Sequence, residues 1–180
     1  CSAILVCARS IVNANPPALP AETPVVAPTT KQHLILIIGA SGADEYKETF
    51  QTWATRWQDA AKRADADCTV IGDAESTAKD LEKLTTSISE MISVDTTEPL
   101  WIVFIGHGTF DGRTASLNLN GPDVSAVKMA ELLQPAKRPI AFIACASCTS
   151  PFVNALSAPN RIIVSATKDG NQIQYSRFGD

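Results

Sequence analysis

The chain is poor in basic clusters and has no long apolar run, and each scarcity removes a class of partner. Its 15 Lys and Arg residues are outnumbered by 19 Asp and Glu residues, and the net charge is −4. No cluster of basic residues offers a surface for nucleic acid. No stretch approaches the ~18 apolar residues that a membrane-spanning helix requires. We therefore expect neither nucleic acid nor a spanning membrane segment. The 180 residues suit one domain with a substantial core.

Histidine is also scarce, which argues against a metal centre. The chain has two histidines, five cysteines and a single C-x-x-C pair, Cys145 and Cys148. This pair and one histidine supply three ligands, whereas a structural zinc site takes four. The number and spacing of the cysteines neither establish nor exclude disulfides. We expect no metal and no cofactor.

The first 31 residues differ in composition from the rest. Residues 1–14 (CSAILVCARSIVNA) resemble the apolar part of a secretory signal with a small-residue exit, without a preceding Met or basic stretch. Residues 15–31 hold five of the eleven prolines and no helical or strand period, which is typical of an extended tether. These patterns predict a partial targeting segment, a Pro-rich linker, and a secreted or periplasmic protein. A lipoprotein acylated at Cys1, or a cytosolic extension, is the alternative.

From residue 32 onward, apolar strands alternate with amphipathic helices. Strands are predicted at 34–38, 68–71, 100–105, 140–144 and 161–166, with a small hairpin at 115–119. Helices are predicted near 46–57, 81–91, 127–133 and 152–156. This alternation predicts an α/β fold, with a mostly parallel sheet between two layers of helices. The pattern stops at Asp180 before its last unit closes, so we expect a domain over 32–180 that is truncated at its C-terminus.

Local signals predict where two helices begin. Asp123 or Ser125 is expected to cap the helix that Pro135 ends. Ser150 is expected to cap the following helix, with Pro151 as its first residue.

Several other side chains have structural interpretations. Trp53 and Trp57 are expected to pack in the core, and Cys68 to be buried within its strand. His33 begins the first strand, at the far end from the other strand exits, and is expected to be a structural or surface histidine. Asp111, which precedes a glycine, is at least as well explained as a turn residue as by substrate contact.

Two strand exits carry reactive side chains. The run WIVFIGHG ends in His107 and Gly108, and the run IAFIACASC delivers Cys145. In open parallel sheets, functional groups collect beyond the carboxyl ends of the strands. A thiolate is a strong nucleophile, and histidine exchanges protons near neutral pH. Glycine lets the backbone approach a substrate closely, so its N–H is suited to hold an oxyanion.

The histidine-first order and these strand exits resemble the caspase-like cysteine peptidases (clan CD), and most closely the legumain family. The resemblance covers roughly residues 32–180. It includes the Gly-x-x-Gly turn after the first strand (39–42), the LNLNGPDVSA stretch (117–126), and Ser165-Ala166-Thr167 after the last strand. It implies a three-layer α/β sandwich of the caspase type.

The resemblance also implies roles for individual residues. Cys145 would be the nucleophile, His107 the catalytic histidine, and the backbone N–H groups of Gly108 and Cys145 the oxyanion hole. The substrate-binding residues would be Ser41, Ser165, Ala166 and Thr167. The implied partner is a peptide or protein substrate, and no metal is required. Legumains carry Asn in the first turn and acidic residues beside Ala-Cys, where this chain has Ser41, Ile143 and Ala146. The implied peptidase chemistry therefore carries over better than asparagine specificity.

Three other functions compete with this interpretation. The Cys145–Cys148 pair is also a thiol–disulfide redox motif, although thioredoxin-like proteins carry theirs after the first strand and at the start of a helix. A caspase-like domain without catalytic activity would bind a partner in the crevice expected beyond the carboxyl ends of the same strands. The turn IIGASGADE is similar to a dinucleotide-binding loop, but Glu45 occupies the position of its third glycine.

Overall fold

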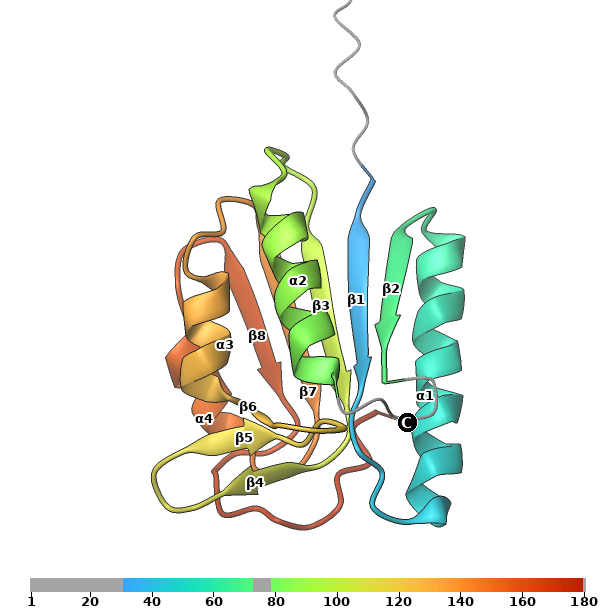
Figure 1. Cartoon of the computed structure of the whole chain (residues 1–180), viewed down its shortest axis with the longest axis vertical. Coiled ribbons are helices and arrows are strands. Elements are labelled where there is room, and N and C mark those ends of the chain that lie inside the picture. Colours follow the sequence, from blue (N-terminus) through green and yellow to red (C-terminus); the bar gives the residue numbers. More distant parts are fainter. Residues whose placement is uncertain (1–30, 73–78, 180) are drawn as a thin grey trace, which may run out of the picture.

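Five apolar runs form the central sheet, which is parallel throughout. The strands are β1 (His33–Ile38), β2 (Asp67–Ile71), β3 (Leu100–Ile105), β7 (Ile140–Cys145) and β8 (Arg161–Ser165), in the order β2-β1-β3-β7-β8 (Figure 1). This computed structural model describes residues 31–72 and 79–179. The predicted targeting segment over 1–14 and nearly all of the predicted linker over 15–31 lie outside the described residues. The strands agree with the predicted ones to within one residue at each end.

Helices cover both faces of the sheet, because alternate strand residues point to opposite sides. On one face, α2 (Asp80–Ser93), α3 (Ala126–Leu133) and α4 (Ser150–Leu156) pack against a cluster that includes Phe104 and Phe142. On the other face, α1 (Asp44–Arg63) packs against a cluster that includes Leu36, Val103 and Cys145. The predicted three-layer α/β sandwich with a mostly parallel sheet is confirmed.

Helix α1 follows the turn after β1 and packs against one face of the sheet. It begins with two acidic residues and ends with Lys62 and Arg63, which complements the helix dipole. Its buried residues include Phe50 and Trp53. The prediction that Trp57 belongs to the core is only half right, because its ring is half-buried and lines a cleft.

A second, smaller sheet lies beyond the carboxyl ends of the parallel strands (Figure 1). It is antiparallel and consists of β4 (Gly108–Phe110), β5 (Ala115–Leu117) and β6 (Val124–Ser125). The predicted hairpin therefore has three strands rather than two. Asp111 forms the turn before β5, since its carboxylate accepts backbone N–H groups of Arg113 and Thr114 at 2.8 and 2.7 Å. These bonds lower the pKa of Asp111, led by the bond from Thr114, and the turn interpretation is confirmed.

The predicted helix caps were right in one case and displaced by one residue in the other. Ser125 caps α3, because its Oγ accepts the Lys128 N–H at 3.1 Å. Ser150 is the first residue of α4 rather than its cap, which is Thr149. Proline is tolerated anywhere in the first turn, so Pro151 did not fix the start to one residue.

Cys68 corrects another prediction, because it is exposed rather than packed. Strand β2 is at the edge of the sheet and pairs only with β1. An apolar run therefore did not guarantee burial at this position.

Candidate active site

His107 follows the central strand β3 and is fixed at one ring nitrogen. Its Nε2 lies 3.1 Å from the carbonyl oxygen of Ser41, in the turn between β1 and α1. A carbonyl oxygen only accepts, so Nε2 carries the proton of this hydrogen bond. In the neutral ring, Nδ1 is then the nitrogen with a free lone pair. Ser41, predicted as a substrate-binding residue, contacts His107 through its backbone.

The His107 ring is half-buried among aromatic side chains. Tyr46 and Phe50 of α1 and Tyr175 near the C-terminus lie with their ring centroids at 4.8, 5.2 and 6.5 Å from the imidazole. Tyr46 and Phe50 belong to the helix predicted near 46–57, and no contact with His107 was predicted for them.

Gly108 sits against the turn that follows β7. Its N–H donates to Ser147 Oγ at 3.3 Å, and the same hydroxyl donates to the Gly108 carbonyl at 3.1 Å. A Cβ on Gly108 would come within 2.1 Å of the Ser147 carbonyl oxygen, so no other residue fits without movement. Ser147 therefore links the residues that follow β3 to those that follow β7. Its hydroxyl oxygen accepts the Gly108 N–H that was predicted to form part of the oxyanion hole.

Cys145 ends β7, next to Ile105 of β3 in the register of the sheet. Its side chain is 2% exposed and packs in the cluster on the α1 face, which is also the side on which the His107 ring contacts α1. In the described part of the chain, no hydrogen bond joins the Cys145 thiol to the His107 ring. Burial raises the pKa of this thiol to about 12, so the group is neutral in this state.

A cleft of about 430 Å³ reaches Cys145 from the α1 side. It is lined by Arg56, Trp57, Ala60, Ile143, Cys145, Val164, Phe178 and Gly179. Phe178 and Gly179 belong to the segment after β8, so this segment covers part of the surface beside the thiol.

The raised pKa of Cys145 predicts a pH-dependent contribution to stability. The folded state favours the neutral thiol, whereas the unfolded chain ionises near the ordinary value of 9.0. The contribution is complete below pH 9.0 and is lost as pH rises towards about 12. At one pKa unit per 1.36 kcal/mol, the full loss is about 4 kcal/mol. Between neutral and strongly alkaline pH, denaturant titrations should show a smaller fall in unfolding free energy for Cys145→Ala than for the wild type. Equal falls in the two proteins would contradict this account.

The residues predicted to line the substrate pocket hold the start of α4. Ser165 Oγ lies 2.9 Å from Thr149 Oγ1, and Thr167 Oγ1 accepts the N–H groups of Thr149 and Ser150 at 2.9 and 3.2 Å. The Ala166 N–H donates to the Ala144 carbonyl at 3.1 Å and extends the pairing of β7 and β8. All three lie at the same sheet end as Cys145, and their role towards a substrate stays a prediction.

Cys148 makes hydrogen bonds to Gln172 and forms no disulfide with Cys145. Its backbone has a φ of 57°, its N–H donates to the Gln172 carbonyl at 3.0 Å, and its Sγ lies 3.5 Å from the same oxygen. Cys145 and Cys148 are both free thiols. Burial also raises the pKa of Cys148, so neither thiol is activated in this state.

The second histidine is remote from this site. His33 begins β1, at the opposite end of the sheet, and its Nε2 lies 2.9 Å from Thr69 Oγ1. Burial lowers the pKa of His33. Its structural interpretation is confirmed.

Sequence reasoning did not predict roles for Asn118, which contacts His107, or for Ser147, which contacts Gly108. The Asn118 N–H donates to the His107 carbonyl at 3.0 Å, and the Asn118 carbonyl accepts the Ala40 N–H at 3.0 Å. Asn118 Oδ1 is buried and accepts no hydrogen bond within the described ranges. The only sequence signal for Asn118 was its place in the LNLNGPDVSA stretch, and Ser147 carried no signal beyond its closeness to Cys145.

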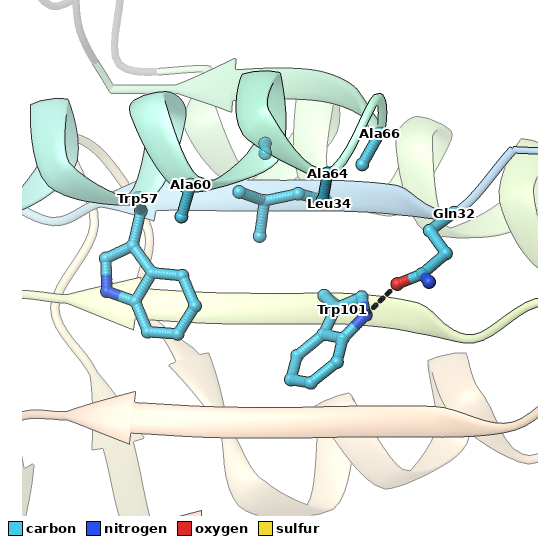
Figure 2. Close-up of a pocket in the computed structure, with 8 residues that line it drawn as sticks. Gln32, Leu34, Trp57, Ala60, Ala64, Ala66 and Trp101 are labelled. Carbon is cyan, nitrogen blue, oxygen red and sulfur yellow. Dashed lines mark hydrogen bonds between the residues drawn. The ribbon is translucent and has the colours of Figure 1, made fainter.

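A separate apolar pocket of about 170 Å³ lies nearer the amino-terminal end of the sheet. Figure 2 shows Trp57 and Trp101 beside the sheet, with the Trp101 indole N–H donating to Gln32 Oε1 at 3.0 Å. Trp57 and Ala60 line this pocket and also the cleft beside Cys145. An apolar surface therefore extends from the nucleophile candidate along the flank of α1.

Over 31–72 and 79–179, no group of three His, Cys, Asp or Glu side chains is arranged to hold a metal ion. In the same part of the chain, no helix is long and apolar enough to cross a membrane.

Comparisons with known proteins support the fold alone. No protein family and no curated protein matches the chain. The solved structure of protein GSU0716 from Geobacter sulfurreducens is similar, with a TM-score of 0.51 and 12% identity over 66% of this chain. The chain spans about half of that protein, 51% of its length. Raptor from Chaetomium thermophilum aligns with a TM-score of 0.48 and 14% identity, over 71% of this chain and 12% of Raptor. Neither description names a peptidase.

Proposed function

We propose that this protein is a cysteine endopeptidase that uses Cys145 and His107. One observation carries the proposal: the two residues leave adjacent parallel strands, β3 and β7, at the same end and on the same face of the sheet. In parallel sheets this end is the usual position of a reaction centre. The caspase-like resemblance, with legumain as its nearest family, is part of the same proposal.

His107 would act as the proton carrier. The hydrogen bond from Nε2 to Ser41 leaves Nδ1 free to accept a proton from the Cys145 thiol. Because the thiol has a raised pKa in its buried state, ionisation has to be coupled to substrate binding and to this transfer. The protonated ring then gives its proton to the leaving amine.

The thiolate would attack the scissile carbonyl carbon and form a C–S bond as the carbonyl electrons move to oxygen. The N–H groups of Gly108 and Cys145 would stabilise that oxyanion. Since Gly108 now donates to Ser147 Oγ at 3.3 Å, the oxyanion would replace the hydroxyl as its acceptor. Collapse of this intermediate breaks the C–N bond, and water then hydrolyses the thioester.

A substrate would approach Cys145 from the cleft on the α1 side. Phe178, which is 52% exposed, and Gly179 line that cleft and would have to move for a peptide chain to enter. The proposed partner is a peptide or protein substrate. The enzyme would be secreted or periplasmic, and its export would rest on residues 1–14. No metal or cofactor takes part in the proposed steps.

Two assays on the purified full chain distinguish this function from thiol–disulfide exchange. A mixed peptide library analysed by mass spectrometry should reveal new peptide termini. Insulin should not be reduced by the dithiol form. Insulin reduction that needs both Cys145 and Cys148 but survives loss of His107 would support the oxidoreductase instead. Neither activity, combined with binding of a protein at this crevice, would support a non-catalytic domain.

A further inference from the structure

Within residues 31–72 and 79–179, the His107 ring makes no hydrogen bond to an acidic side chain that would orient it. Among the described residues, the hydrogen bond of the ring is the one from Nε2 to the Ser41 carbonyl. A single hydrogen bond fixes one ring atom but leaves the ring free to tilt about it. Proton transfer needs both the atom and the ring plane in place, because small misplacements cost large factors in rate.

Two aromatic rings from α1 pack against the imidazole. Tyr46 lies edge-on to it, at 4.8 Å between centroids and 86° between planes, and Phe50 lies at 5.2 Å and 62°. Residues four apart share one face of a helix, so both rings come from consecutive turns on the same side. The two contacts therefore limit how far the imidazole can tilt on the side of α1.

Tyr46 and Phe50 are themselves held by further aromatic contacts. Phe50 is fully buried, and its ring stacks on Tyr46 at 6.2 Å. On its other side, Tyr46 contacts Tyr175 at 5.0 Å, and Tyr175 stacks on Trp53 at 5.9 Å. Such edge and stacked contacts stabilise aromatic pairs beyond the effect of the area that they bury.

We infer that Tyr46 and Phe50 are positioning residues for His107: their rings hold the imidazole so that Nε2 stays on the Ser41 carbonyl and Nδ1 remains available for proton transfer. This inference rests on the proposed function for its catalytic meaning. Its structural content can be measured without any substrate.

The test uses the scarcity of histidine, since only His33 and His107 give imidazole signals. Proton–nitrogen NMR spectra of the ¹⁵N-labelled full chain should show a slowly exchanging Nε2–H for His107. We expect that signal to be lost in Phe50→Leu and in Tyr46→Leu, because a tilted ring exposes the N–H to water. Tyr46→Phe, which keeps the ring and loses only the hydroxyl, should retain the signal.

Phe152→Leu is the matched control for loss of a core ring. Phe152 is 1% exposed and stacks on Phe142 at 5.9 Å, on the opposite face of the sheet from His107. It should be destabilised to a similar degree as Phe50→Leu and keep the Nε2–H signal. Should Phe50→Leu fail to fold, the half-buried Tyr46 still gives a decisive variant.

Persistence of the signal in the folded leucine variants would overturn the inference, as would its equal loss in Phe152→Leu. If the peptidase activity is found, kcat of the leucine variants should fall about 10- to 100-fold with KM little changed. An absent activity with the predicted NMR result would contradict the proposed function and leave the positioning of His107 intact.

Discussion

Replacing Cys145 with alanine is expected to abolish peptide hydrolysis, with kcat/KM falling by at least about 10³-fold. Without the thiol, the C–S bond of the intermediate cannot form. The oxyanion donors and the binding surface would then supply only the small residual rate that such sites give without a nucleophile.

Cys148→Ser is the matched control for this variant. Both cysteines are almost fully buried, at 2% and 1% exposure, and they lie three residues apart. The serine hydroxyl replaces a thiol that contacts the Gln172 carbonyl, so the local fold should persist. Most of the activity should remain in Cys148→Ser. Full hydrolysis by Cys145→Ala, or loss of hydrolysis in Cys148→Ser alone, would contradict the assignment of Cys145 as the nucleophile.

Replacing His107 with alanine is expected to lower kcat by about 10²- to 10⁴-fold, the range of general acid–base catalysis. The Cys145 pKa of about 12 makes the loss pH-dependent. Without an internal base, the thiolate fraction has to come from direct ionisation, so the residual rate should rise with pH towards about 12. Peptide hydrolysis measured across the alkaline range checks both the loss and this slope.

His33→Ala provides the comparison, because His33 lies at the opposite end of β1 and contacts Thr69. It should hydrolyse the peptide at close to the wild-type rate. A residual rate in His107→Ala that is independent of pH, or a loss of the same size in His33→Ala, would contradict the role of His107 as the proton carrier.

The sequence was sufficient to predict the elements and their alternation, for identifiable reasons. The runs that became β1, β3 and β7 are buried on both faces, so they are nearly continuous in apolar residues. The apolar spacing of α1, from Tyr46 to Trp57, marks the face that packs on the sheet. Local backbone and side-chain preferences therefore located the strand ends that carry His107 and Cys145.

What the sequence could not supply was set by contacts between distant segments. Cys68 is exposed because β2 is an edge strand, and strand order is a property of the whole fold. The hydroxyl of Ser147 meets Gly108 across 39 residues of sequence. Tyr175 lies against His107 from a segment without regular structure. No local pattern encodes such pairings.

The predicted substrate-binding residues Ser165 and Thr167 have structural contacts of their own. Ser165 and Thr167 make hydrogen bonds to the start of α4, which accounts for their residue types without a substrate. The residue preference of the proposed enzyme can be read from the new termini of its cleavage products.

The most direct test of the central claim is covalent labelling of the intact protein with a peptidyl acyloxymethyl ketone. This electrophile needs an active peptidase thiol, and the test identifies the residue that it modifies. Mass spectrometry should find one adduct on the wild type, mapped to Cys145. The adduct should be absent from Cys145→Ala and form far more slowly in His107→Ala. Modification of Cys148 or the exposed Cys68 instead, or a labelling rate unchanged by loss of His107, would contradict the account.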